Sequence, residues 1–251
     1  MPMFNGLRSK RVLITGASGD IGSTMARLFA SYGAMVGAHY YRNKASAEQL
    51  ASDIKETGGT AAVFYADLAT DPAHTSLVQD FIAAFNGIDV LVNNAGANIG
   101  NHPFWEMDFP SWQHTFNLNC TAPFFLSQQA FIHMKDHAGG RIINISSVGA
   151  KYGGYTRSIH YAGAKGALEA ITRGLSQAGA PHNILVNAIR GGFIDTAFHH
   201  KAPKEDLKKR IELIPLGRAG TPEDVARMAL FLASQGGDYI TGQVFSVTGG
   251  D

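Results

Sequence analysis

Short apolar runs alternate with amphipathic segments along most of the chain. Residues 11–15 form an apolar run that ends at a glycine-rich turn, and Met25, Leu28 and Phe29 then recur at helical spacing. The same order repeats, with further strands predicted over 35–39, 61–65, 90–92, 141–145, 184–189 and 244–247. Strands that are apolar on both faces and alternate with helices are typical of a parallel sheet covered on both sides. The predicted fold is therefore α/β and doubly wound, with a central parallel sheet of about seven strands.

Several predicted helices begin at capping signals. Ser46 and Gln49 have the spacing of a capping box at the start of a helix over 46–57. Asp71-Pro72 suits the start of a helix that runs to about residue 85, and Thr221-Pro222 starts one that reaches about residue 232. Long helices are predicted over 112–134 and 158–177. Residues 191–215 are less regular, and we interpret them as a substrate flap within a single domain of residues 1–251.

Charge and composition narrow the function. The 21 basic and 20 acidic side chains give a formal charge of +1, so no global field attracts nucleic acid or an acidic membrane surface. Cys120 is the only cysteine, which excludes an intrachain disulfide and favours a reducing compartment. No run reaches the roughly 18 apolar residues of a membrane helix, and residues 1–10 lack a signal-like apolar run. We expect a cytoplasmic protein whose partner is a small molecule.

Polar and glycine-rich segments follow three of the predicted strands. The sequence Thr15-Gly-Ala-Ser-Gly-Asp-Ile-Gly22 lies between the first strand and the first helix, where backbone amides and the helix dipole can hold a pyrophosphate. An isolated glycine-rich segment is more often an ordinary tight turn, but this position favours dinucleotide binding. Asp67-Leu68 and Asn93-Asn-Ala-Gly96 follow two other strands. These segments are expected to meet at the carboxyl edge of the sheet.

Tyr161 and Lys165 are four residues apart on a predicted helix, so they share one face of it. An ammonium beside a phenol favours the phenolate and suits the phenol to general acid catalysis near neutral pH. The spacing alone is weak evidence, because Tyr40 and Lys44 show it too at a strand-to-loop transition. We assign that second pair no catalytic role.

Taken together and in this order, the motifs resemble the short-chain dehydrogenase/reductase family, and within it the 3-oxoacyl-acyl-carrier-protein-reductase-like branch. The resemblance spans almost the whole chain and implies a Rossmann fold and a nicotinamide cofactor. It is carried by residues 15–22, Asp67, 93–96, Asn119, 142–147, 161–165, Asn187, 192–196 and 241–243.

The resemblance also implies roles for single residues. Tyr161 protonates the carbonyl oxygen of the substrate, and Ser147 polarises it, although the adjacent Ser146 competes for that role. Lys165 binds the nicotinamide ribose and lowers the pKa of Tyr161. Asn119 holds a water that links Lys165 to solvent, unless it merely marks a helix kink or a satisfied core amide. The implied cofactor-binding residues, with Asp67 at the adenine and Thr196 at the carboxamide, are Gly16, Ser18, Gly19, Asp20, Ile21, Gly22, Tyr41, Arg42, Asp67, Leu68, Asn94, Ala95, Gly96, Tyr161, Lys165, Gly192, Ile194 and Thr196.

Three features depart from the family pattern. Asp20 replaces the usual middle glycine, and we interpret it as a cap of the following helix rather than as a repulsive charge beside the pyrophosphate. Arg190-Gly-Gly192 replaces the usual Pro-Gly, so the turn loses a rigid element and flap dynamics are expected to differ. The stretch 148–160 is slightly longer than in many members, and substrate shape is a role we consider for it.

The end of the second strand bears on the choice of cofactor. It carries no acidic residue for the ribose of NAD, whereas Arg42, with Lys44 near it, offers cations to a 2′-phosphate. A solvated basic loop is the alternative explanation. We predict NADP(H), with NAD(H) as the less favoured cofactor and reduction as the direction.

Other functional readings remain open at this point. The leading hypothesis is reduction of a ketone to a secondary alcohol; the alternatives are an NAD-dependent sugar or polyol dehydrogenase and an inactive dinucleotide-binding subunit. Substrate-pocket candidates, equally suited to core or interface, are Trp105, Tyr152, Tyr155, Phe193 and Phe198. We predict no metal site, since His199-His200 has no further ligands at suggestive spacing. The resemblance further implies a homotetramer assembled through the helices 112–134 and 158–177 and a C-terminal strand.

Overall fold

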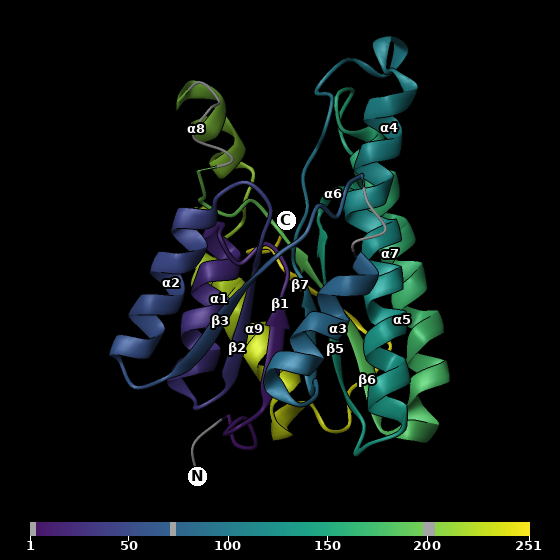
Figure 1. The fold of residues 1–251 in the computed structure, drawn as a ribbon. Coiled ribbons are helices and arrows are strands. Elements are labelled where there is room, and N and C mark those ends of the chain that lie inside the picture. The colour runs from purple at the N-terminus through teal and green to yellow at the C-terminus, as the bar shows by residue number, and fades with distance from the viewer. Residues whose placement is uncertain (1–3, 71–73, 198–203) are drawn as a thin grey trace.

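A seven-stranded, all-parallel sheet forms the centre of the molecule in the computed structural model, which describes residues 4–70, 74–197 and 204–251 (Figure 1). The strand order is β3-β2-β1-β4-β5-β6-β7. The strands are β1 (Arg11–Ile14), β2 (Met35–Tyr40), β3 (Thr60–Tyr65), β4 (Val90–Asn93), β5 (Gly140–Ser147), β6 (Ile184–Gly191) and β7 (Val244–Val247). All seven predicted strands are confirmed, and so is the doubly wound α/β fold.

Helices cover both faces of this sheet (Figure 1). They are α1 (Asp20–Ser31), α2 (Lys44–Glu56), α3 (His74–Phe85), α4 (Phe109–Phe116), α5 (Ala122–Lys135), α6 (Gly149–Tyr152), α7 (Ile159–Gly179), α8 (Lys204–Glu212) and α9 (Pro222–Ala233). One apolar core joins α1, α2 and α9 to the sheet, and a second core joins it to α3 and α5, with α7 against that second face. Strands buried on both faces explain why their sequences lack apolar-polar alternation.

Two capping predictions have different outcomes. Thr221 caps α9 in a capping box, because its side chain accepts from the amide of Asp224 and the Asp224 carboxylate accepts from the amide of Thr221. The Ser46 prediction was wrong: α2 begins at Lys44, and Asn43 accepts a hydrogen bond from the amide of Ser46 at 3.3 Å. An asparagine one position before the helix forms the same cap as serine, so the two starts are hard to separate by sequence.

The long helix predicted over 112–134 is interrupted. Between α4 and α5, residues Asn117–Thr121 form a π-helical turn that contains Asn119. Pro123, in the first turn of α5, has no amide hydrogen to donate to the preceding turn. A π-helical turn accommodates such a break in the regular hydrogen-bond ladder, and these turns are frequent at functional sites.

The segment interpreted as a flap contains more structure than the sequence predicts. Its residues 204–212 form α8, which stands beyond the carboxyl edge of the sheet (Figure 1). Arg210 on α8 pairs with the carboxylate of Asp251. The predicted helix start Asp71-Pro72, the pocket candidate Phe198 and the pair His199-His200 lie outside the described residues. Within the described ranges, none of the helices has the length and apolar character that a membrane span requires.

Candidate active site

The segments singled out in the sequence meet at one edge of the sheet. β1 and β4 are neighbours in the sheet, and the chain continues from them on opposite sides of it. Such a switch point at the carboxyl ends of the strands is where doubly wound sheets bind ligands. The loops after β1, β2, β3, β4, β5 and β6 all open onto this edge, so the predicted cofactor-binding and catalytic residues lie on the same side of the molecule.

Two of the glycines after β1, Gly16 and Gly22, are required by the backbone conformation or by close packing. Gly16 has φ of +65°, a conformation that side chains disfavour. A β-carbon on Gly22 would lie 2.3 Å from the carbonyl oxygen of Gly16, whereas one on Gly19 would meet only that oxygen, at 3.6 Å. The turn is therefore tight against the start of α1 at Gly22 and open at Gly19. This arrangement is a backbone cradle of the kind that holds a pyrophosphate.

Thr15 joins the turn after β1 to the loop after β4. Its hydroxyl oxygen accepts hydrogen bonds of 2.9 Å from the amides of both Asn94 and Ala95. The side-chain amide of Asn94 in turn donates to the carbonyl oxygen of Thr15 at 2.9 Å. Three residues from two strand ends are thus fixed to one another. Thr15 is the centre of this contact, although the sequence analysis assigned it no role beyond its place in the glycine-rich segment.

His39 also supports the glycine-rich turn, a role that the sequence analysis missed. The imidazole is buried, its Nδ1 accepts from the amide of Gly16 at 3.0 Å, and its Nε2 donates to the carbonyl oxygen of Ala66 at 3.1 Å. Burial lowers the pKa of His39 to about 4. The neutral ring therefore connects the loops after β1 and β3. Only its place at the end of a buried strand hinted at such a role.

Asp20 does not cap α1 with its side chain, contrary to our prediction. Gly19 is the N-cap residue and makes no side-chain cap, and Asp20 is the first helical residue. Its carboxylate instead accepts a 2.7 Å hydrogen bond from the amide of Ala197, in the segment after β6. The two residues line a cleft of about 340 Å³ together with Thr196. Asp20 and Thr196, far apart in the sequence, are thus brought together as expected for one binding site.

Asp67 is held in place by its own loop. Burial opposes its ionisation, but hydrogen bonds from Thr70, the amide of Ala69 and the hydroxyl of Tyr41 outweigh this and lower its pKa. Leu68 beside it is buried in the core. Arg42 is exposed, with its guanidinium 5.2 Å from the centre of the Tyr41 ring. Asp67, Tyr41 and Arg42 therefore form one polar edge at the ends of β2 and β3.

The two adjacent serines at the end of β5 face opposite sides. Ser147 hydrogen-bonds to the hydroxyl of Tyr161 and accepts from the amide of Gly149 at 3.1 Å. Ser146 donates to the buried carboxylate of Glu169 at 2.7 Å. Alternation along a strand explains the difference, and it places Ser147, not Ser146, beside Tyr161.

Lys165 follows Tyr161 by one turn of α7 and is 2 % exposed. Its ammonium donates to the carbonyl oxygen of Ile145 at 2.7 Å and lies 5.8 Å from the centre of the Tyr161 ring. Burial lowers the pKa of Lys165 to about 8. The expected lowering of the Tyr161 pKa is not found, because burial raises it and the hydrogen bond with Ser147 offsets only part of that effect.

Asn119 is buried, and half of its amide lacks a partner. The side-chain nitrogen donates at 2.8 Å to the carbonyl oxygens of Ala97 and Thr115, while Oδ1 has no hydrogen-bond partner among the described residues. A β-carbon on Gly96 would lie 2.7 Å from this oxygen and 3.1 Å from the ammonium of Lys165. Gly96 thus leaves space between the two groups, so Asn119 is more than a satisfied core amide.

The segment 190–192 is not the loosened turn that we predicted from the absence of proline. Arg190 belongs to β6 and forms an ion pair with Glu169 at 2.7 Å. After it, a β-carbon on Gly192 would come within 2.7 Å of Thr248, while Ile194 is buried. Trp105, Tyr152 and Tyr155 are more than half exposed, and Phe193 borders a cavity between α9 and β7.

These features together fit a nicotinamide dinucleotide. The turn is open beside Gly19, where a β-carbon would occupy the free space; an orphaned amide oxygen lies beside Lys165, and Arg42 supplies an exposed cation at the far end of the same edge. Among the residues that the structure describes, no group of three or more His, Cys, Asp or Glu side chains is arranged to hold a metal ion.

Comparison with known proteins agrees with this geometry. The family model described as enoyl-(acyl carrier protein) reductase matches residues 16–251. The chain is 38% identical over 248 residues to the 3-oxoacyl-(acyl-carrier-protein) reductase FabG of Chlamydia pneumoniae, covering 97% of each sequence. It is 34% identical over 257 residues to the hydroxynaphthalene reductase-like protein Arp2 of Metarhizium brunneum, covering 97% of this chain and 95% of the relative.

Solved structures show the same likeness. A blue fluorescent protein from a metagenomic library, in complex with NADPH, has a TM-score of 0.91 and 34% identity, with 97% of this chain and 98% of that chain covered. A short-chain dehydrogenase of Burkholderia cenocepacia, in complex with NADP, has a TM-score of 0.91 and 30% identity, with 98% and 99% covered. The chain therefore belongs to the short-chain dehydrogenase/reductase family of NAD(P)-dependent oxidoreductases.

Proposed function

We propose that this oxidoreductase uses NADPH to reduce a ketone to a secondary alcohol. The observation that carries the proposal is the convergence of Ser147, Tyr161 and Lys165 at the carboxyl edge of the sheet. A β-carbon on Gly149 would lie 3.4 Å from the hydroxyl oxygen of Ser147 and 4.0 Å from the Tyr161 ring, and the Lys165 ammonium lies 5.8 Å from the centre of that ring. A dinucleotide-binding subunit has no need of this arrangement. Relatives named as reductases of 3-oxoacyl and hydroxynaphthalene substrates support the direction of the reaction.

The chain supplies the proton and the orientation of the substrate. Ser147 donates a hydrogen bond to the carbonyl oxygen, and Tyr161 transfers its phenolic proton to the same oxygen. Burial raises the pKa of Tyr161, so the phenol is protonated at neutral pH and holds the proton that it transfers. When bound, the nicotinamide supplies the hydride for the carbonyl carbon.

Reprotonation of Tyr161 needs a path to solvent. We assign that path to Lys165 and to a water held by the unpartnered Oδ1 of Asn119, since both groups border the space next to Gly96. Lys165 also binds the nicotinamide ribose in this proposal. A lysine whose pKa is about 8 exchanges protons readily near neutral pH.

The remaining cofactor contacts follow the loops. The backbone of the turn at residues 16–22 holds the pyrophosphate, Asp67 and Leu68 contact the adenine, and Asn94, Ala95 and Gly96 line the middle of the site. Thr196, with Gly192 and Ile194, reaches the carboxamide. The exposed guanidinium of Arg42, next to Tyr41, binds the 2′-phosphate, which favours NADP(H) over NAD(H).

A panel of ketones tests the function. Purified protein is mixed with NADPH and acyl-thioester β-ketones, cyclic ketones or sugar ketones, and oxidation of NADPH is followed. Turnover with at least one ketone, faster with NADPH than with NADH, is the expected result. Binding of NADPH without turnover of any ketone would favour the inactive subunit, and oxidation of a polyol with NAD alone would favour the dehydrogenase.

We also propose a homotetramer, with a cytoplasmic location as a further prediction. Exposed apolar side chains on α4, α5 and α7, namely Trp112, Phe125, Ile132 and Ile159, suit contacts between copies. Light scattering of the purified protein is expected to give four copies, and a monomer would contradict this assembly.

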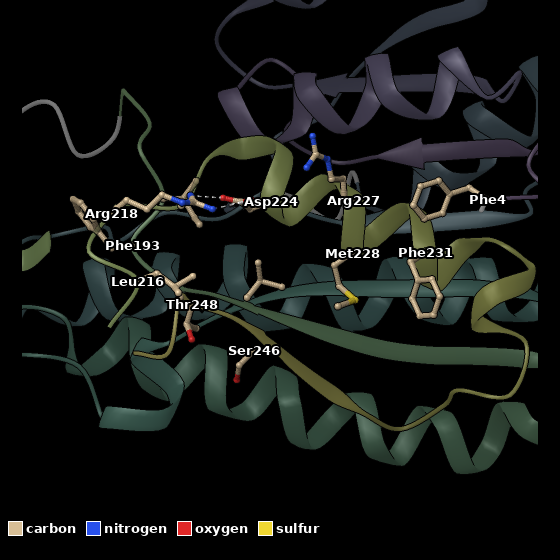
Figure 2. A pocket seen from close by; sticks show the side chains of 14 residues that line it. Phe4, Phe193, Leu216, Arg218, Asp224, Arg227, Met228, Phe231, Ser246 and Thr248 are labelled. Carbon is tan, nitrogen blue, oxygen red and sulfur yellow. Dashed lines mark hydrogen bonds and ion pairs between the residues drawn. The ribbon is translucent and has the colours of Figure 1, made fainter. Parts of the chain in front are cut away.

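A separate cavity of about 420 Å³ lies between α9 and β7. Phe4, Met228 and Phe231 lie toward one end of it, and the Arg218–Asp224 ion pair lies at the other (Figure 2).

A further inference from the structure

A buried ion pair lies directly behind the site and has no part in the proposed proton transfer. The carboxylate of Glu169 accepts from both Nε and Nη2 of Arg190, at 3.0 and 2.7 Å, and from the hydroxyl of Ser146 at 2.7 Å. The Glu169 side chain is 7% exposed and that of Arg190 is 19% exposed. Burying two charges is costly unless each is fully paired, so the position of this pair calls for an explanation.

Three successive turns of α7 are bound to three consecutive residues at the end of β5. Tyr161 bonds to Ser147, Lys165 to the carbonyl oxygen of Ile145, and Glu169 to Ser146. The spacing of four residues places the three side chains on one face of the helix. Of these three residues, Glu169 alone has no assigned part in the reaction. It nevertheless accepts the hydrogen bond from Ser146, the residue next to Ser147.

Arg190 extends this contact across the sheet. It is the register partner of Ser146 on β5 and of Ser246 on β7, and its Nη1 lies 3.4 Å from the hydroxyl oxygen of Ser246. The next residue, Gly191, accepts a 2.8 Å hydrogen bond from the amide of Val148, where the loop after β5 begins. The ion pair is therefore connected to both loops that flank the site.

We propose that Glu169 is a positioning residue for Ser147 and Tyr161, with Arg190 as its obligatory charge partner; this inference rests on the proposed reductase function. The pair fixes the position of α7 along its axis relative to the end of β5, so that the hydroxyls of Ser147 and Tyr161 lie within hydrogen-bonding distance. Misplacement of reacting groups by about 1 Å costs on the order of 100-fold in rate. The pair makes no contact with substrate or cofactor in this proposal, so its loss changes the chemical step more than binding.

The test compares Glu169→Gln, Arg190→Lys, Arg190→Met and the double variant Glu169→Gln/Arg190→Met with the unmodified protein. Arg141→Met is the matched control, because Arg141 pairs with Asp238 at 2.7 Å at the opposite end of the same strand β5. We expect Glu169→Gln to lower kcat by about 10- to 100-fold while the Kd for NADPH changes by less than about threefold. Arg190→Lys is expected to retain more of kcat than Arg190→Met, and the control stays within about twofold.

A second measurement does not depend on turnover. The titration of Tyr161 is followed by NMR of isotope-labelled tyrosine, with Tyr161→Phe to assign the signal. Removing a negative charge at Glu169 would by itself lower the pKa of Tyr161, whereas loss of the Ser147 hydrogen bond raises it. We expect the midpoint to rise by about half a pH unit or more in Glu169→Gln.

The outcomes separate this inference from the proposed function. If the unmodified protein reduces no ketone but the tyrosine midpoint rises in Glu169→Gln, the proposed reductase function is wrong and the positioning role of Glu169 stands. If Glu169→Gln and the double variant lower only the melting temperature, with kcat and the tyrosine titration unchanged, the pair is merely structural. The double variant leaves no buried charge unpaired, so it covers the case in which a single variant fails to fold.

Discussion

The ammonium of Lys165 donates a 2.7 Å hydrogen bond to the main-chain oxygen of Ile145, two residues before Ser147 on β5. This contact holds the end of a buried lysine beside the tyrosine that we assign as the acid. Burial of the charged Lys165 side chain lowers the stability of the folded protein, as shown by its pKa, which burial lowers from 10.5 to about 8.

That cost leads to a prediction for Lys165→Met. Between pH 10.5 and about 8 the unfolded chain binds a proton that the folded chain does not, so the stability of the folded protein decreases as pH falls through this window. The penalty is fully present below pH 8. At pH 7 the variant should therefore be inactive but more stable by about 1 to 3 kcal/mol. Urea unfolding at pH 7 and near pH 10 measures this, and a less stable variant with no pH-dependent difference would show that the buried charge costs nothing.

His39 predicts acid sensitivity. Its folded pKa of about 4 lies below the ordinary value of 6.5, so the unfolded chain takes up the proton first as pH falls. Stability from the neutral ring is present above pH 6.5 and is lost as pH falls to about 4, by roughly 2 to 4 kcal/mol. His39→Asn keeps an acceptor for the amide of Gly16 but cannot titrate, and should flatten this dependence in urea unfolding. The exposed His102→Asn serves as control and should follow the unmodified protein; equal slopes in all three would exclude His39 as the cause.

Gly96→Ala tests the space between Asn119 and Lys165. The added β-carbon would lie 2.7 Å from Oδ1 of Asn119, too close for either group to stay in place. We expect kcat to fall by about 10- to 100-fold, because the proton path and the lysine are both displaced. Gly174→Ala on α7 is the control, since no atom lies within 4 Å of its added carbon, and it should keep kcat and gain up to about 1 kcal/mol in stability. Unchanged kcat in Gly96→Ala would mean that this space is not used.

Arg42→Ala tests the choice of cofactor. A hydrogen bond to a charged group contributes about 1.5–3 kcal/mol, so the preference for NADPH over NADH should fall by about 10- to 100-fold. The control is Lys55→Ala, which removes an exposed cation from the last turn of α2 and should leave the preference unchanged. Steady-state KM values for both cofactors measure the effect. An equal loss with NADPH and NADH would place Arg42 away from the 2′-phosphate.

Local patterns in the sequence were enough to predict the sheet and the place of the site. Apolar runs gave the strands, and the glycines after β1 and the pair Tyr161 and Lys165 lie at the carboxyl edge, as predicted. The sequence could not show the contact between Asp20 and Ala197, because 177 positions separate them and only the parallel sheet, in which β1 and β6 end at the same edge, brings them together.

Two further features could be predicted only in part or not at all: a kink at Asn119 was one reading of the sequence, but its form was not predicted, and the role of Glu169 was missed. The π-helical turn at Asn119 depends on how α4 and α5 pack, and the apolar pattern of the segment is that of one continuous helix. Glu169 has the sequence context of an ordinary surface residue of a helix, and its partner Arg190 comes 21 positions later on a strand. Buried polar pairs of this kind become visible only when the register of the sheet is known.

The central claim is that Tyr161 gives its proton to a carbonyl oxygen beside Ser147. Single-turnover hydride transfer from NADPH to a ketone substrate tests it, with Tyr161→Phe compared with Tyr40→Phe, which removes the hydroxyl from the other tyrosine that precedes a lysine by four residues. We predict a loss of about 100- to 10,000-fold for Tyr161→Phe, with NADPH binding retained and Tyr40→Phe near the unmodified rate. Hydride transfer by Tyr161→Phe at the unmodified rate would contradict the account.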